Sequence, residues 1–148
     1  MSTDAAVTKD LVQTLEDGKE GFAKGAVKLD DTKSPELAAT FRKYSDQRSE
    51  FATELQTMAK EYGDHIEESG SVAAAVHRGW LSLKDALAGS SPKGVLEAAE
   101  KGEDHAVKEY EKALQADLSP ALRTVVERQF AEVKAAHDAV SSLAKSQN

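Results

Sequence analysis

The chain has no cysteine, which excludes disulfides, thiol nucleophiles and thiolate metal sites. Long hydrophobic runs are also missing: the longest extends from Val72 to Val76, far short of the roughly 20 residues that a membrane span requires. The first residues lack a basic stretch followed by an apolar one, so no targeting signal is visible. These absences predict a cytoplasmic protein of bacterial type.

Positive charge is in deficit: 19 lysines and arginines face 26 aspartates and glutamates, for a net charge of −7 and a pI near 5.1. A chain of this sign repels phosphate backbones and anionic lipids, which argues against nucleic acid and membranes as partners. With 148 residues, of which 40% are hydrophobic and 30% charged, it has the size and composition of one folded domain over residues 1–148.

Proline is scarce, and each of the three prolines follows a serine: Ser34-Pro35, Ser91-Pro92 and Ser119-Pro120. A serine side chain before a helix accepts a hydrogen bond from an N–H group of the first turn, and proline at the first helical position has no N–H to lose. Each pair therefore predicts a helix start with a serine cap.

Apolar residues recur at spacings of three and four through most of the chain and nowhere alternate as in a strand. The predicted fold class is all-α, a four-helix bundle with an additional short crossover helix between the second and third long helices. We expect the long helices over about 3–29, 35–62, 92–116 and 120–145, and the crossover helix over about 72–88, long enough at helical rise to traverse the bundle.

Two helix faces are candidates for contacts with other proteins. The first predicted helix contains Gly18, Gly21 and Gly25, each of which costs up to about 1 kcal/mol relative to alanine. Either a closely packed neighbour or a kink accounts for these glycines. This glycine face, and the face of the crossover helix that carries Trp80, are the two surfaces that we expect to be exposed.

Polar residues interrupt the faces that should be buried: Arg48, Glu103, Gln129 and His137. An isolated buried charge costs several kcal/mol, so we expect these four side chains to meet in one buried network. The alternative is that Glu103 and His137 hold a metal ion. His137 and Asp138, by contrast, diverge by about 100° as helix neighbours, and we do not expect them to act at one spot.

Five segments carry a family resemblance: DGKEGF, ELAATFRKYSDQRSEFATEL, SVAAAVHRGW, GEDHAVKEYEKAL and RQFAEVKAAHDAV. Together they resemble a bacterial family of ferritin-like four-helix-bundle proteins, a domain of unknown function, over nearly the whole chain. The resemblance implies a ferritin-like fold and no particular activity.

Iron-binding ferritin-like proteins use a Glu from each of two helices and a Glu-x-x-His pair from each of the other two. On that pattern Glu103 corresponds to the lone glutamate of the third helix and His137 to the histidine of the fourth. Arg48 and Phe51 replace the pair of the second helix, and Lys134 stands where a glutamate should precede His137. The resemblance thus implies a degenerate di-iron site in which cationic side chains replace iron. If a metal is retained, the candidate ligands are Glu103, His137, Glu20, Glu50, Glu100 and Glu132.

The leading functional hypothesis is a non-enzymatic, stress-associated bundle protein without a cofactor, which works as a homo-oligomer or through a protein partner. The rival is an iron or other divalent-metal protein, an oxidase or storage module, that uses the remaining Glu and His ligands. A third idea is a haem or small-ligand binder, for which Met58 and the histidines supply groups. No catalytic residue is predicted, because no nucleophile lies beside a base.

Overall fold

The computed structural model describes residues 3–61, 79–80, 82–89 and 91–147. These residues contain no strand and form five helices: α1 (Thr3–Asp31), α2 (Pro35–Glu61), α4 (Leu83–Ala88), α5 (Pro92–Leu114) and α6 (Pro120–Ser146). The predicted all-α class is confirmed, and the four long helices begin and end within two residues of the predicted positions. No helix in the described ranges is long and apolar enough to cross a membrane.

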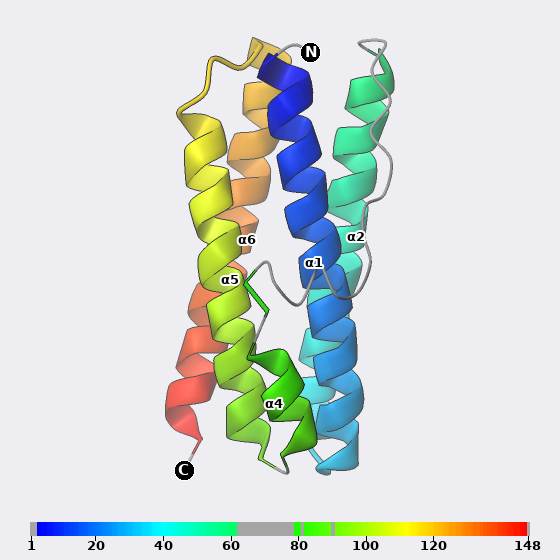
Figure 1. Cartoon of the computed structure of the whole chain (residues 1–148), viewed down its shortest axis with the longest axis vertical. Helices are drawn as coiled ribbons and strands as arrows, with labels where there is room; N and C mark the ends of the chain where they lie inside the picture. Colours follow the sequence, from blue (N-terminus) through cyan, green and yellow to red (C-terminus); the bar gives the residue numbers. More distant parts are fainter. Residues whose placement is uncertain (1–2, 62–78, 81, 90, 148) are drawn as a thin grey trace.

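The four long helices stand side by side (Figure 1). α1 and α6 run in one direction along the bundle, and α2 and α5 run in the other. α1 packs against both α2 and α5, α5 packs against α6, and α2 touches α6 much less. Because α2 ends at the opposite end of the bundle from the start of α5, the chain has to travel the length of the bundle between them.

Proline occupies the first turn of α5 and of α6, as predicted. The predicted serine caps are wrong for both helices, because neither Ser91 nor Ser119 makes a side-chain hydrogen bond to the first turn. At Ser119 the backbone N–H instead donates to Oδ1 of Asp4 at 3.0 Å. The start of α6 is thus tied to the first turn of α1.

The predicted crossover helix over 72–88 is wrong at Gly79, Trp80 and Ser82, which lie outside any helix. Gly79 has a φ of +98°, a conformation that interrupts a right-handed helix and that glycine adopts readily. Helix α4 begins only at Leu83 and ends before Gly89. The remaining predicted helical positions, 72–78 and 81, lie outside the described residues.

Trp80 fills a slot between α1 and α5 and is only 2% exposed. A β-carbon added to either Gly21 or Gly102 would lie 2.5 Å from Cδ2 of the indole, so both helices need glycine where they face it. Gly18 and Gly25 are buried as well, against the side chains of α2. Close approach by side chains therefore explains the glycines, and the prediction that the glycine face and the Trp80 face are exposed is wrong.

Two apolar clusters fill the bundle, one towards each end. One is built around Leu11, Leu15, Phe51, Leu55, Tyr110, Leu122, Val126 and Val133. The other is built around Phe22, Leu29, Phe41, Trp80, Leu83, Val95, Leu96 and Val140. On each long helix the two sets are separated by a short stretch that carries polar residues, and the candidate site lies in this middle layer.

Candidate functional site

An ion pair occupies the centre of the bundle. Arg48 of α2 and Glu103 of α5 are 1% and 0% exposed. Nη1 of Arg48 donates to Oε1 of Glu103 at 2.5 Å, and Nη2 donates to Oε2 at 2.7 Å. Two parallel charge-assisted hydrogen bonds of this kind set the orientation of both planar groups, so they also set how α2 and α5 lie relative to each other. The structure thus brings these two predicted residues together.

The guanidinium of Arg48 lies against α1 at Gly18. A β-carbon on Gly18 would lie 3.4 Å from Nη1 of Arg48, so the guanidinium rests close to the α1 backbone. Cζ of Arg48 lies 5.4 Å from the centre of the Phe22 ring, a cation–π contact. Nε of Arg48 donates to Oε1 of Gln47 at 3.3 Å. Protein groups therefore satisfy the buried cation from three sides.

Arg48 keeps its positive charge near neutral pH. Burial alone would lower the pKa of Arg48, but the charge of Glu103 and the hydrogen bonds to it outweigh burial and raise that pKa. For the nearby Tyr44, burial and the negative charge of Glu103 raise the pKa of the phenol. Since general acid–base catalysis needs a group that exchanges protons near the working pH, neither side chain is suited to it.

Gln129, the third residue of the predicted network, belongs to a separate group. Its Oε1 accepts a hydrogen bond from the hydroxyl of Tyr110 at 2.7 Å, and its Nε2 donates to Oε1 of Glu54 at 2.8 Å and to the backbone oxygen of Phe51 at 3.3 Å. Glu54 also forms an ion pair with Arg128 at the surface. Burial raises the pKa of Tyr110, which therefore stays protonated and donates. These hydrogen bonds join α2, α5 and α6 through two uncharged side chains, those of Tyr110 and Gln129.

Sequence reasoning missed Tyr110 and Glu54 as polar partners. A signal for Tyr110 is present in the spacing, because it follows Glu103 by seven residues and so lies on the same buried face of α5. Glu54 gives no such signal, since it is partly exposed on α2 and reaches Gln129 from the side.

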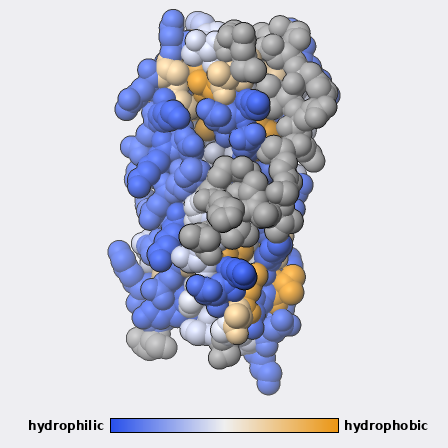
Figure 2. All heavy atoms as spheres, in the orientation of Figure 1, coloured by the Kyte–Doolittle hydropathy of each residue, from blue (hydrophilic) through white to orange (hydrophobic). Residues whose placement is uncertain are grey.

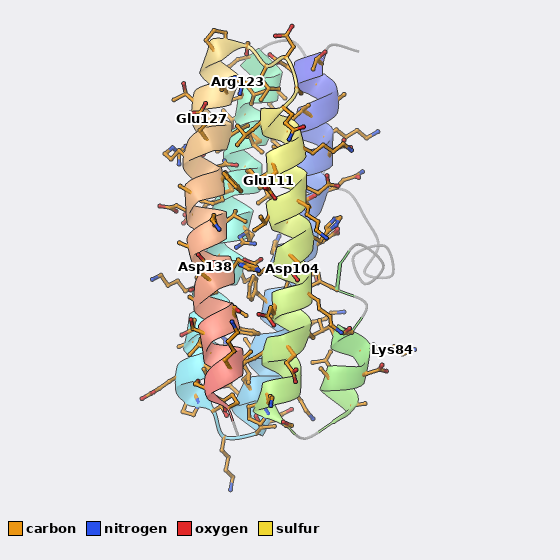
Figure 3. All side chains as sticks on the ribbon, turned by 90° about the vertical axis from the view of Figure 1, so that its left-hand side faces the viewer. Lys84, Asp104, Glu111, Arg123, Glu127 and Asp138 are labelled. Atoms are coloured by element: carbon orange, nitrogen blue, oxygen red, sulfur yellow. The ribbon has the colours of Figure 1, made fainter. Side chains whose placement is uncertain are left out.

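His137 is not part of the buried network, and that prediction is wrong. Its half-buried ring lies between two carboxylates: Nε2 is 2.6 Å from Oδ1 of Asp104 on α5, and Nδ1 is 3.1 Å from Oδ1 of Asp138 on α6. Figure 3 labels Asp104 on α5 and Asp138 on α6 at the same level of the two helices. The expectation that His137 and Asp138 cannot act at one spot is also wrong, because the two side chains bend towards each other although their Cβ atoms diverge.

The imidazole of His137 is placed to carry a positive charge. Partial burial alone would lower its pKa, but hydrogen bonds to Asp138 and Asp104 outweigh burial and raise that pKa. Only the doubly protonated ring can donate to both carboxylates at once. His137 thus links α5 to α6 most strongly when it is charged.

The predicted metal ligands are not brought together. Both carboxylate oxygens of Glu103 are held by Arg48, and His137 faces away from them towards the surface. No group of three or more His, Asp or Glu side chains among the described residues is arranged to hold a metal ion. The residues at the centre therefore do not fit a di-iron site. The other four candidates are Glu20 on α1, Glu50 on α2, Glu100 on α5 and Glu132 on α6. Glu50 and Glu132 line one hollow at the surface, where Glu132 accepts a hydrogen bond from Gln47 at 3.4 Å, but the described residues add no third ligand there.

Comparison with known families gives a match over most of the chain. The family model described as "Domain of unknown function (DUF2383)" matches residues 5–116, which include α1 from Ala5 onwards, α2, α4, α5 and both members of the central ion pair. The match ends before α6. No match was found among curated proteins.

Proposed function

The chain belongs to this family of unknown function, and from its own geometry we propose that it is a non-enzymatic, ferritin-like bundle protein that acts through self-association or protein contacts. The observation that carries the proposal is the buried Arg48–Glu103 pair. The guanidinium engages both oxygens of a carboxylate that, in a ferritin-like iron protein, would be free to ligate metal. Arg48 thus supplies the positive charge that iron would otherwise provide.

The direction of the helices supports the ferritin-like part of the proposal. Such folds have two antiparallel helix pairs joined by one long connection. Here α1 and α2 form one antiparallel pair, α5 and α6 form the other, and α2 and α5 run in the same direction (Figure 1).

The non-enzymatic part rests on the chemistry of the buried polar side chains. Arg48 and Tyr110 keep one protonation state near neutral pH, and Glu103 is fully engaged with Arg48. A centre of this kind fixes the packing of helices but offers no free base, nucleophile or ligand. Contacts with a second copy or another protein are then the activity that the remaining surface can support.

Metal analysis of protein purified without chelator tests the proposal. We expect far less than one equivalent of iron, manganese or copper per chain, and a melting temperature that EDTA does not change. Glu103→Gln should leave the metal content as low as in the wild type. Stoichiometric metal that disappears in both Glu103→Gln and His137→Gln would overturn the proposal in favour of a metalloprotein.

A further inference from the structure

The outer face of α1, near its C-terminal end, bears an exposed apolar side chain. Val27 is 59% exposed and is the most exposed large hydrophobic residue in the described part of the chain. It lines a hollow of about 320 Å³ together with Lys24, Lys28 and Asp31 of α1 and Leu87 of α4. Figure 2 shows hydrophobic patches at this end of the molecule set among hydrophilic side chains. We call these five residues the α1 face.

The order of charges on the α1 face is self-complementary. Lys24, Val27, Lys28 and Asp31 follow one another at spacings of three, one and three, so they form one stripe along the helix. The midpoint between positions 24 and 31 is also the midpoint between positions 27 and 28. A twofold axis at that midpoint, perpendicular to α1, would place Lys24 of each copy opposite Asp31 of the other.

We propose that the α1 face is a twofold homodimer interface, in which Val27 of each copy packs beside the axis against Val27 and Lys28 of the other. Two Lys24–Asp31 ion pairs, one on each side of the axis, then close the contact. The proposal rests on the self-association part of the proposed function and identifies the surface that carries it. A twofold contact uses the same patch on both copies, which is why the charge order matters.

The charges of the α1 face fit a second copy of this chain better than they fit an unrelated acidic partner. A purely basic patch would attract any acidic partner, whereas this stripe ends in a carboxylate that repels one. The alkyl stem of Lys28 can cover Val27 of the partner while its ammonium group stays in water. Leu87 extends the apolar area beside the axis. One helix face and a short helix give a contact at the small end of specific interfaces, so we expect a reversible, concentration-dependent dimer.

Sedimentation velocity over a concentration series tests the proposal. The wild type should shift from monomer towards dimer as concentration rises, and Val27→Glu, which places two like charges beside the axis, should remain monomeric. Circular dichroism checks that the variant is still folded, which is expected because the side chain is exposed.

A charge swap identifies the pairing itself. Lys24→Glu and Asp31→Lys should each raise the dimer Kd about tenfold or more, equivalent to about 1.4 kcal/mol for the two ion pairs together. Combining both substitutions restores opposite charges and should recover the wild-type Kd. Lys145→Glu, at an exposed position on α6, changes the net charge as much as Lys24→Glu does and serves as the matched control.

The outcomes separate this proposal from the function proposed above. A wild type that stays monomeric at every concentration overturns the α1 interface and leaves the metal-free bundle untouched. A dimer that survives Val27→Glu, or a charge swap that fails to recover affinity, shows that self-association uses another surface. A metal-loaded protein would overturn the proposed function whatever the oligomeric state.

Discussion

Glu103 and Asp104 are consecutive residues of α5, yet they pair in opposite surroundings. The Glu103 side chain is 0% exposed and is bound by Arg48 inside the bundle, whereas the Asp104 side chain is 52% exposed and faces His137 at the surface. Water can replace the lost partner of an exposed charge but cannot reach a buried one. Burial, more than the chemistry of the pair, therefore determines what the loss of a partner costs.

The strongest way to test this contrast is to remove the buried carboxylate. Glu103→Ala should lower the free energy of unfolding by about 3–5 kcal/mol, because it leaves the charge of Arg48 buried without its partner. Urea denaturation followed by circular dichroism measures the change. Glu103→Gln should be milder, since the amide can still accept a hydrogen bond. Unfolding of Glu103→Ala at the wild-type urea concentration would contradict the central role of the pair.

At Gly102, next to Glu103, a substitution can change the packing of the bundle without changing its charge. Gly102→Ala should lower the free energy of unfolding by about 1–3 kcal/mol, because the new methyl group collides with the indole of Trp80. Gly94→Ala on the same helix is the matched control: its β-carbon would lie 4.0 Å from the nearest atom outside the local backbone, Cβ of Ala86. The control should be neutral or stabilising by up to about 1 kcal/mol. If both substitutions changed the free energy of unfolding equally, close contact with Trp80 would not explain the glycine at position 102.

The contribution of the Asp104–His137 pair to stability can be tested by varying the pH. The pKa of His137 is raised in the folded protein, so its contribution to stability is fully present below its ordinary pKa of about 6.5 and is lost as pH rises through the raised value. His137→Gln should remove at most about 1 kcal/mol at low pH and nothing at high pH. Unfolding free energies measured for both proteins across this range should therefore converge as pH rises. Parallel curves would mean that the imidazolium contributes nothing.

The smallest effect is expected at a partly exposed ion pair on the surface. Arg128→Ala removes the surface partner of Glu54 and should cost about 0.5 kcal/mol or less, because water and Gln129 remain to solvate the carboxylate. Urea denaturation in low and in high salt checks this expectation. A loss comparable to that of Glu103→Ala would remove the contrast between buried and exposed pairs.

Much of the bundle is predictable because its signals are local. Proline at the first helical position identifies the starts of α2, α5 and α6, and apolar residues at helical spacing identify all four long helices, without reference to the rest of the chain. The pairing of Arg48 with Glu103 is predictable for a different reason: a charge on a buried face requires a partner, and these are the two opposite charges at mid-helix.

The failures arise where the outcome depends on side-chain reach or on another helix. The apolar pattern continues through Trp80, so periodicity cannot reveal that Gly79 breaks the helix and lets the indole enter a slot made by two distant glycines. Burial of Gln129 was visible in the pattern, but its partners come from α2 and α5. The ring of His137 contacts Asp104 on α5 and Asp138 on α6, and no sequence pattern records these contacts.

Because Trp80 is buried between α1 and α5, its fluorescence can be used to follow unfolding of this region. Trp80 is the chain's single tryptophan, so all indole fluorescence originates from the joint between these two helices. A red shift or increased quenching that precedes loss of helicity would report that the joint opens before the bundle melts. Intrinsic tryptophan fluorescence thus reports local separation of α1 and α5 without an added label.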